Sequence, residues 1–150
     1  LRNVREACGE PVADLHAAPS SLRAVRIDGA EVPSLVDEIP VIAALAARAE
    51  GTTVIEGAAE LRVKESDRIA DMVRNVRAVG AVAEELPDGM VIHGSDAPLA
   101  GEVAALHDHR IAMAFGVLAA GGAEIRVDDP GVVGVSFPRF WDLMHQVQAA

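Results

Sequence analysis

The sequence has little of several residue types, and each shortage excludes a class of protein. It contains one cysteine and no tyrosine, and aromatic residues make up 3% of its 150 residues. Because Cys8 has no second cysteine to pair with, an internal disulfide is excluded. Proteins of the reducing cytoplasm typically have no disulfides, so we expect a cytoplasmic protein. Few aromatics argue against stacking of single-stranded nucleic acid, and 13 basic against 23 acidic residues argue against polyanion binding in general, so we expect no nucleic-acid partner.

Long apolar runs are also missing. The two longest, near residues 39–47 and 111–123, are shorter than the ~20 residues of a membrane-spanning helix, so we expect no membrane partner. The start of the chain does not have the pattern of a signal peptide, and its first residue is Leu1, which suggests a piece cut from something longer. With 51% hydrophobic and 24% charged residues, the chain has the composition of a folded globular domain.

Hydrophobic periodicity predicts strands and helices that alternate along the whole chain. Strands are expected at residues 1–8, 11–16, 22–27, 52–56, 81–85, 90–93, 102–105 and 124–127. Helices are expected at residues 37–47, 66–79, 108–120 and 137–148. Because a helix followed by a strand occurs in a similar plan after Asp37 and after Asp108, we expect a mixed α/β domain built from two copies of one folding unit.

One short segment concentrates charge around the only lysine of the chain. Lys64 lies in the segment LRVKESDRI (residues 61–69), whereas every other basic residue is arginine, so this position is a candidate for a compact ammonium group. In a helical turn, Lys64 and Glu65 would both lie beside Arg68, and three ionisable side chains would converge. A solvated helix start held together by ion pairs explains the same residues, and both interpretations stay open.

Two predicted helices carry an arginine near their first turn. Asp108 is a suitable N-cap for the helix at residues 108–120, but Arg110 opposes the helix dipole there, as Arg68 does in its own helix. Helix N-termini bind carboxylates and phosphates, and arginine adds a bidentate clamp. We therefore expect a small anionic ligand near both arginines.

Other chemistries find little support in the sequence. His107 and His109 could be metal ligands, but their spacing places them on different helix faces, so we predict no metal. Cys8 has no nearby histidine to activate it as a nucleophile. The glycines do not form a G-x-G-x-x-G loop or a P-loop, so we predict no cofactor.

Several of these segments together resemble one enzyme family. Residues 61–69 and Asp108–Met113 are similar to two signatures of the 5-enolpyruvylshikimate-3-phosphate (EPSP) synthases. Further matching segments lie in the family's order at residues 37–40, 49–53 and 136–138. The resemblance implies a mixed α/β fold of repeated βαβαββ units, the inside-out barrel of the enolpyruvyltransferases. It also implies that this chain is the carboxyl-terminal fragment of a longer two-domain enzyme.

The resemblance further implies an activity and a role for each site residue. Phosphoenolpyruvate would pass its enolpyruvyl group to the 5-hydroxyl of shikimate 3-phosphate. Glu65 would donate a proton to the methylene carbon, and Asp37 would accept the hydroxyl proton and bind shikimate hydroxyls. Lys64 would lie near the reacting oxygen, while Arg68 and Arg110 would hold the carboxylate of phosphoenolpyruvate. Such chemistry needs these acid, base and cationic groups.

The resemblance leaves some positions and alternatives to be tested. Glu60 and Asp108 are supporting candidates, although Glu60 stands where many members have an asparagine that contacts shikimate 3-phosphate. Val135 stands where many have a phosphate-binding lysine. About two units are expected, at roughly residues 1–65 and 66–150, with the other site residues in the missing amino-terminal part. The alternatives are the sibling that uses UDP-N-acetylglucosamine and a non-catalytic acidic binding or regulatory module.

Overall fold

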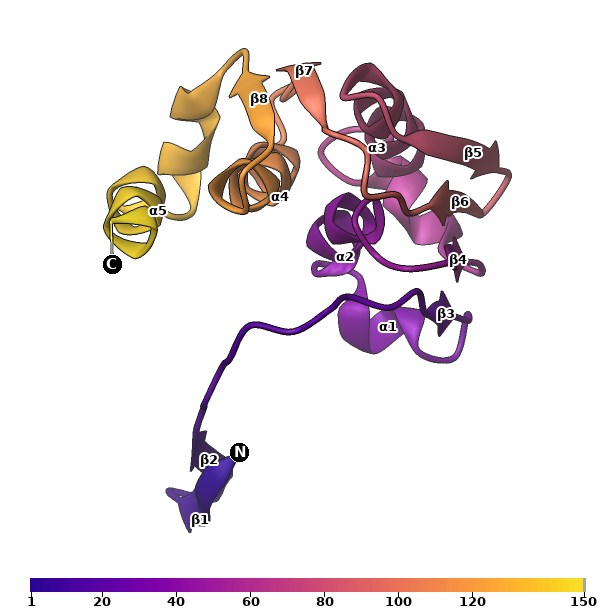
Figure 1. Cartoon of the computed structure of the whole chain (residues 1–150). Coiled ribbons are helices and arrows are strands. Elements are labelled where there is room, and N and C mark those ends of the chain that lie inside the picture. The colour runs from indigo at the N-terminus through magenta and orange to yellow at the C-terminus, as the bar shows by residue number, and fades with distance from the viewer. Residues whose placement is uncertain (150) are drawn as a thin grey trace.

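The structure is a computed structural model that describes residues 1–149. The strands are β1 (Arg2–Ala7), β2 (Glu10–Asp14), β3 (Arg26–Ile27), β4 (Thr52–Ile55), β5 (Val82–Leu86), β6 (Gly89–His93), β7 (Ala100–Val103) and β8 (Glu124–Val127). The α-helices are α1 (Val32–Leu35), α2 (Ile39–Ala46), α3 (Arg68–Ala78), α4 (His109–Ala120) and α5 (Phe140–Gln148), and the 3-10 helices are η1 (Ala59–Val63) and η2 (Pro130–Val135). Helices and strands alternate as expected, which confirms the mixed α/β class (Figure 1).

The largest sheet has the strand order β3-β4-β6-β5, in which β3 and β4 are parallel and the other pairs are antiparallel. The path β3, α2, β4, α3, β5, β6 is one complete βαβαββ unit over residues 26–93. The elements β7, α4 and β8 form the βαβ start of a second unit, in which α4 connects the two parallel strands. Residue 65, the predicted unit boundary, lies between β4 and β5 of this sheet, and we propose that the boundary between the two units is the segment between β6 and β7.

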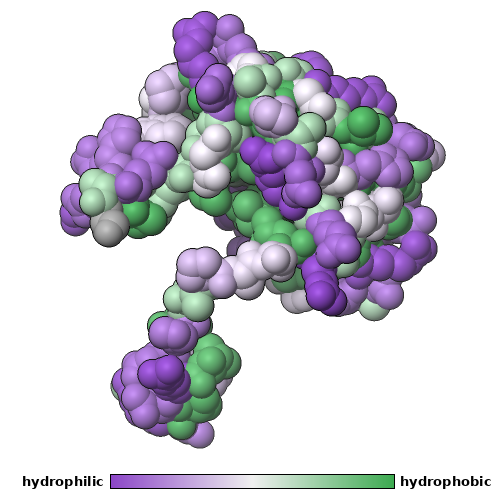
Figure 2. Space-filling model, viewed as in Figure 1, coloured by the Kyte–Doolittle hydropathy of each residue, from purple (hydrophilic) through white to green (hydrophobic). Residues whose placement is uncertain are grey.

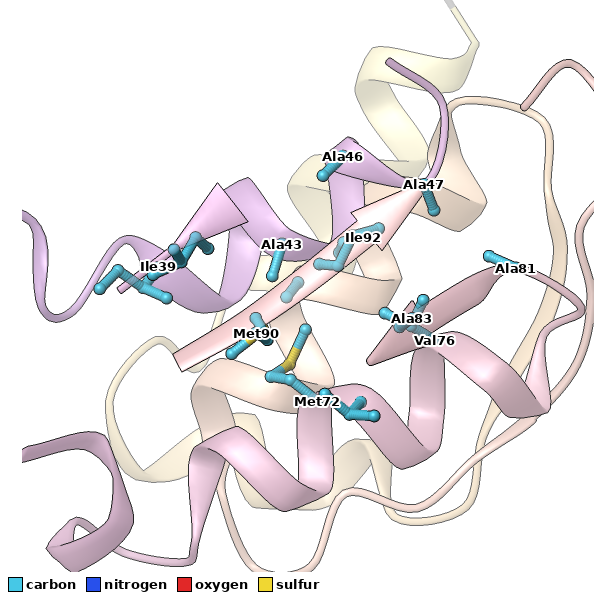
Figure 3. Packing of buried hydrophobic residues seen from close by; sticks show 14 of the residues in the cluster. Ile39, Ala43, Ala46, Ala47, Met72, Val76, Ala81, Ala83, Met90 and Ile92 are labelled. Atoms are coloured by element: carbon cyan, nitrogen blue, oxygen red, sulfur yellow. The ribbon is translucent and has the colours of Figure 1, made fainter. Parts of the chain in front are cut away.

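Helix α2 forms the centre of the core because it has no charged residue on any face. Such a helix must be covered on all sides. It contacts β4 and β6 of the sheet on one side and α4 on another. Ala43, Ala44 and Ala47 are completely buried, and their small side chains allow close packing against these neighbours. Figure 3 shows this packing, with Met90 and Ile92 of β6 close to α2.

Helix α3 covers the same core with an amphipathic face. Its residues Met72, Val73 and Val76 are buried. The side chain of Asp67 accepts a hydrogen bond from the backbone N–H of Ala70, so the helix begins after this N-cap at residue 68 rather than at residue 66. At the other end Gly80 has φ +94°, a left-handed conformation that suits glycine at C′, which confirms the predicted end of the helix.

Several predicted boundaries were wrong. The strand expected at residues 22–27 is regular only in β3, with one isolated bridge between Arg23 and Glu50. The last helix begins at residue 140 rather than 137. None of α1, η1 and η2 was predicted, because helices of four to six residues are too short to show a clear period.

Strands β1 and β2 form a hairpin that stands apart from the other sheets, at the end of an extended segment (Figure 1). Cys8 and Gly9 make its turn with φ of 54° and 81°, the left-handed values of a tight hairpin turn. Every residue of β1 is exposed, and Figure 2 shows hydrophobic residues along one side of the hairpin. None of the helices in residues 1–149 is long and apolar enough to cross a bilayer.

Candidate active site

Three segments that are far apart in the sequence meet at the guanidinium of Arg68, the first residue of α3. Its Nε donates to Asp108 Oδ2 at 2.6 Å, and Asp108 is the N-cap of α4. Its Nη2 donates to Glu65 Oε2 at 2.5 Å, in the loop before α3. Its Nη1 lies 3.5 Å from Asp37 Oδ1, in the loop before α2. Three carboxylates therefore surround one arginine.

The pair of Arg68 and Asp108 is buried. The side chain of Arg68 is 1% exposed and that of Asp108 is 0% exposed. Asp108 also accepts a hydrogen bond from the backbone N–H of Arg110 at 2.9 Å, as an N-cap should. Replacing Arg68 would therefore leave a buried carboxylate without its charged partner.

Asp37 connects the two arginines of the site. Its Oδ2 lies 2.9 Å from Arg110 Nη2, and its backbone carbonyl accepts from Arg110 Nη1 at 2.9 Å. The Asp37 side chain is 47% exposed and that of Arg110 is 31% exposed, so both are accessible to solvent. The chain thus supplies its own carboxylates at the starts of α3 and α4. The unfavourable position of an arginine near the positive end of a helix dipole therefore does not by itself require a bound anion.

Lys64 does not join this cluster in the way expected. Residues 64–67 are not helical, so Lys64 and Arg68 are not neighbours on a helix face. Lys64 instead forms an ion pair with Glu60, one turn earlier in η1. The expected pair of Glu65 and Arg68 is confirmed. Glu60 therefore positions the ammonium group of Lys64.

Arg62 anchors the loop that carries Lys64 and Glu65, a role that the sequence analysis missed. It donates to Asp67 Oδ2 at 2.8 Å and to Glu85 Oε1 at 2.9 Å. It also donates to the carbonyls of Leu86, at the end of β5, and of Pro87, in the turn that follows, both at 2.7 Å. The hydrogen bonds to Glu85 and Asp67 raise the pKa of Arg62 above its usual value. The loop is thus tied to the sheet at a fixed position.

An open cavity of about 260 Å³ lies beside Asp37 and Arg110, between α2, α4 and α5. Apart from these residues and Glu38, its walls are apolar, with Phe137 and Phe140 among them. A small anion at Arg110 would therefore have a polar side toward Asp37 and an apolar side toward the aromatic rings.

The remaining candidates of the sequence analysis lie outside this cluster or lack the expected chemistry. Val135 is 83% exposed at the end of η2, and His107 and Cys8 are exposed. Among residues 1–149, no group of three or more His, Cys, Asp or Glu side chains is placed to hold a metal ion. The cluster of Asp37, Glu65, Arg68, Asp108 and Arg110 is therefore the candidate active site. It can bind anions and exchange protons.

The chain is similar to known proteins over nearly its whole length. The family profile of EPSP synthase (3-phosphoshikimate 1-carboxyvinyltransferase) matches residues 4–144. A 3-phosphoshikimate 1-carboxyvinyltransferase of Syntrophomonas wolfei is 51% identical, in an alignment that covers 97% of this chain and 34% of the relative. One of Geobacter metallireducens is 49% identical, in an alignment that covers 99% of this chain and 35% of the relative.

The fold matches solved structures as well. A structure of EPSP synthase from Acinetobacter baumannii superimposes with a TM-score of 0.85 at 38% identity, over 97% of this chain and 35% of that chain. A second structure of EPSP synthase from the same organism gives a TM-score of 0.82 at 36% identity, over 97% and 34%. The chain thus spans about a third of the length of the proteins that it matches.

Proposed function

The chain belongs to the EPSP synthase (3-phosphoshikimate 1-carboxyvinyltransferase) family, and on this premise we propose that it supplies part of the active site of such an enzyme. The enzyme transfers the enolpyruvyl group of phosphoenolpyruvate to the 5-hydroxyl of shikimate 3-phosphate and releases phosphate. The observation that carries the proposal is the convergence of Asp37, Glu65 and Asp108 on Arg68, with Arg110 beside Asp37. The reaction requires such cations and proton-transfer groups.

Glu65 and Asp37 move the protons in this proposal. In the addition step, the hydroxyl oxygen attacks C2 of phosphoenolpyruvate, its proton passes to Asp37, and C3 takes a proton from Glu65. In the elimination step, the C2–O bond to phosphate breaks, and phosphate leaves with the proton that Asp37 took up. The new methyl group returns a proton to Glu65, so that the double bond forms again. Each carboxylate side chain is 47% exposed, so both are accessible to substrates while Arg68 orients them.

Arg110 binds the carboxylate of phosphoenolpyruvate by exchanging a partner. Its contact with the Asp37 carboxylate is an ion pair between half-exposed side chains, and such a pair contributes little to stability. A bound carboxylate replaces Asp37 at Arg110 and leaves Asp37 available to the shikimate hydroxyls. Arg68 keeps its buried bond to Asp108 throughout, so it offers to the substrate only the side that faces Asp37 and Glu65.

The remaining contacts to the two phosphates come from the part of the enzyme that this chain does not include. Val135 offers no charge to a phosphate, and Glu60 is engaged with Lys64. Lys64, held by Glu60, lies close to the reacting oxygen. This chain therefore supplies about half of a site whose other lysine, arginine and serine ligands belong to the amino-terminal part.

A chimeric enzyme tests the proposal. This chain replaces the matching segment of the Syntrophomonas wolfei relative, and the product and released phosphate are measured with phosphoenolpyruvate and shikimate 3-phosphate. We expect turnover with shikimate 3-phosphate and none with UDP-N-acetylglucosamine as acceptor. A folded chimera that releases no phosphate, beside an active unmodified relative, would refute the catalytic role. Substrate binding without turnover would instead identify a binding module.

A further inference from the structure

The turn that precedes α4 has an unusual backbone. Leu106 and His107 have φ of 55° and 63°, so two consecutive residues with side chains adopt the left-handed conformation. This conformation is disfavoured for L-residues other than glycine. The next residue is Asp108, whose carboxylate caps α4 and binds Arg68. The strained turn therefore directs the central buried carboxylate of the site.

Asn75 fixes the backbone just before this turn. Its Nδ2 donates to the carbonyl of Ala104 at 2.9 Å, and its Oδ1 accepts from the N–H of Ala104 at 3.0 Å. A single side chain thus binds both backbone groups of one residue, as a neighbouring strand would. The next residue is held by a carboxylate, because Asp128 Oδ1 accepts from the N–H of Ala105 at 2.8 Å.

The position of Asn75 within α3 is informative. It is 1% exposed in the middle of a helix, where an apolar side chain would pack without the need for hydrogen-bond partners. Arg68 lies seven residues earlier and therefore on the same face of the helix. The same helix face thus holds the turn at both ends, with Asn75 at Ala104 and Arg68 at Asp108.

From this arrangement we propose that Asn75 is a positioning residue of the active site. It holds the turn at residues 104–108 in its left-handed conformation and thereby sets the places of Asp108 and of Arg110, the first-turn arginine of α4. The inference rests on the proposed function, because it assigns to Asn75 an effect on the binding of phosphoenolpyruvate through Arg110.

The test uses the chimeric enzyme with Asn75→Ala and a matched control. Asp71→Ala is the control, because Asp71 is a buried polar residue of the same helix whose side chain pairs with Arg74 rather than with the turn. We expect Asn75→Ala to raise KM for phosphoenolpyruvate at least tenfold, and KM for shikimate 3-phosphate much less. Asp71→Ala should leave both within about twofold. Equal, near-normal constants in the two variants, with a lowered Tm in Asn75→Ala, would overturn the proposal.

A rescue experiment separates positioning from general stability. Glycine adopts left-handed φ without steric cost, so His107→Gly makes the turn less dependent on Asn75. Added to Asn75→Ala, it should recover at least threefold of the lost kcat/KM, whereas added to Asp71→Ala it should change kcat/KM by less than twofold. Failure to recover kcat/KM while Tm rises would contradict the role assigned to the turn.

Two further measurements cover the remaining outcomes. If Asn75→Ala does not fold, Asp128→Ala releases the N–H of Ala105 in the same turn, together with the N–H of Asp129, and an unchanged KM for phosphoenolpyruvate would then overturn the proposal. Hydrogen exchange of a peptide over residues 104–110 should accelerate at least tenfold in Asn75→Ala and not in Asp71→Ala. An inactive unmodified chimera would refute the proposed function alone, whereas unchanged exchange in an active chimera would refute the positioning role alone.

Discussion

Replacing Arg68 by alanine should strongly destabilise the chain. The substitution removes a guanidinium that is 1% exposed and leaves the carboxylate of Asp108, at 0% exposure, without its charged partner. Loss of one member of a buried ion pair costs about 3–5 kcal/mol. A natural domain has a free energy of unfolding of about 5–15 kcal/mol, so this loss is a large share of the total.

The cost can be measured by urea unfolding followed by circular dichroism, or by melting. At about 2–4 °C for each kcal/mol in a chain of this size, Tm should fall by about 6–20 °C. Arg110→Ala is the matched control, because this side chain is 31% exposed and its ion pair contributes about 1 kcal/mol or less.

A double variant identifies the cause. Arg68→Met combined with Asp108→Leu removes both charges, and replacing a buried pair by apolar residues is often neutral or stabilising. Most of the lost stability should return, less about 1 kcal/mol for the lost N-cap of α4. If Arg68→Ala costs no more than Arg110→Ala, the reasoning from a buried pair is refuted.

Three further predictions concern the site and the sheet. In the chimeric enzyme, Glu65→Gln should lower turnover about 10²–10⁴-fold with little change in KM, because it removes the transferable proton; a near-normal rate would exclude the proton-donor role. Arg110→Ala should weaken phosphoenolpyruvate binding by about 1.5–3 kcal/mol in a KM measurement, and unchanged KM would argue against the clamp. Gly89→Ala should lower Tm, because the added Cβ would lie 1.9 Å from the carbonyl oxygen of Ile55. Gly134→Ala is the control and should leave Tm unchanged, because a Cβ at this position would have no atom within 4 Å. Equal Tm values in the two variants would contradict the close approach at Gly89.

The sequence predicts the longer elements well because their signals are local. The apolar period of α3 and α4, the cap at Asp108 and the glycine at residue 80 all act within a few residues of the helix ends. The 3-10 helix η1 has no comparable signal, and its presence changes the partner of Lys64 from Arg68 to Glu60.

The site itself could be predicted only in part. The family motifs mark Glu65, Arg68 and Arg110, but the burial of Arg68 depends on Asp37 and Asp108, which lie 31 and 40 residues away in the sequence. A local pattern contains no information on such long-range partners. For the same reason the sequence did not show that the chain provides carboxylates of its own, Asp37 and Asp108, beside the two arginines.

The β1–β2 hairpin has a consequence for how copies of this chain behave in solution. In the part of the chain that the structure describes, the two strands pair only with each other, so both outer edges keep unpaired N–H and C=O groups. Such edges are templates for a strand from another molecule, and an isolated two-stranded hairpin is only marginally stable in water. The hairpin is therefore the segment through which concentrated samples would join edge to edge, and a proline or lysine placed on an outer edge would keep the copies apart.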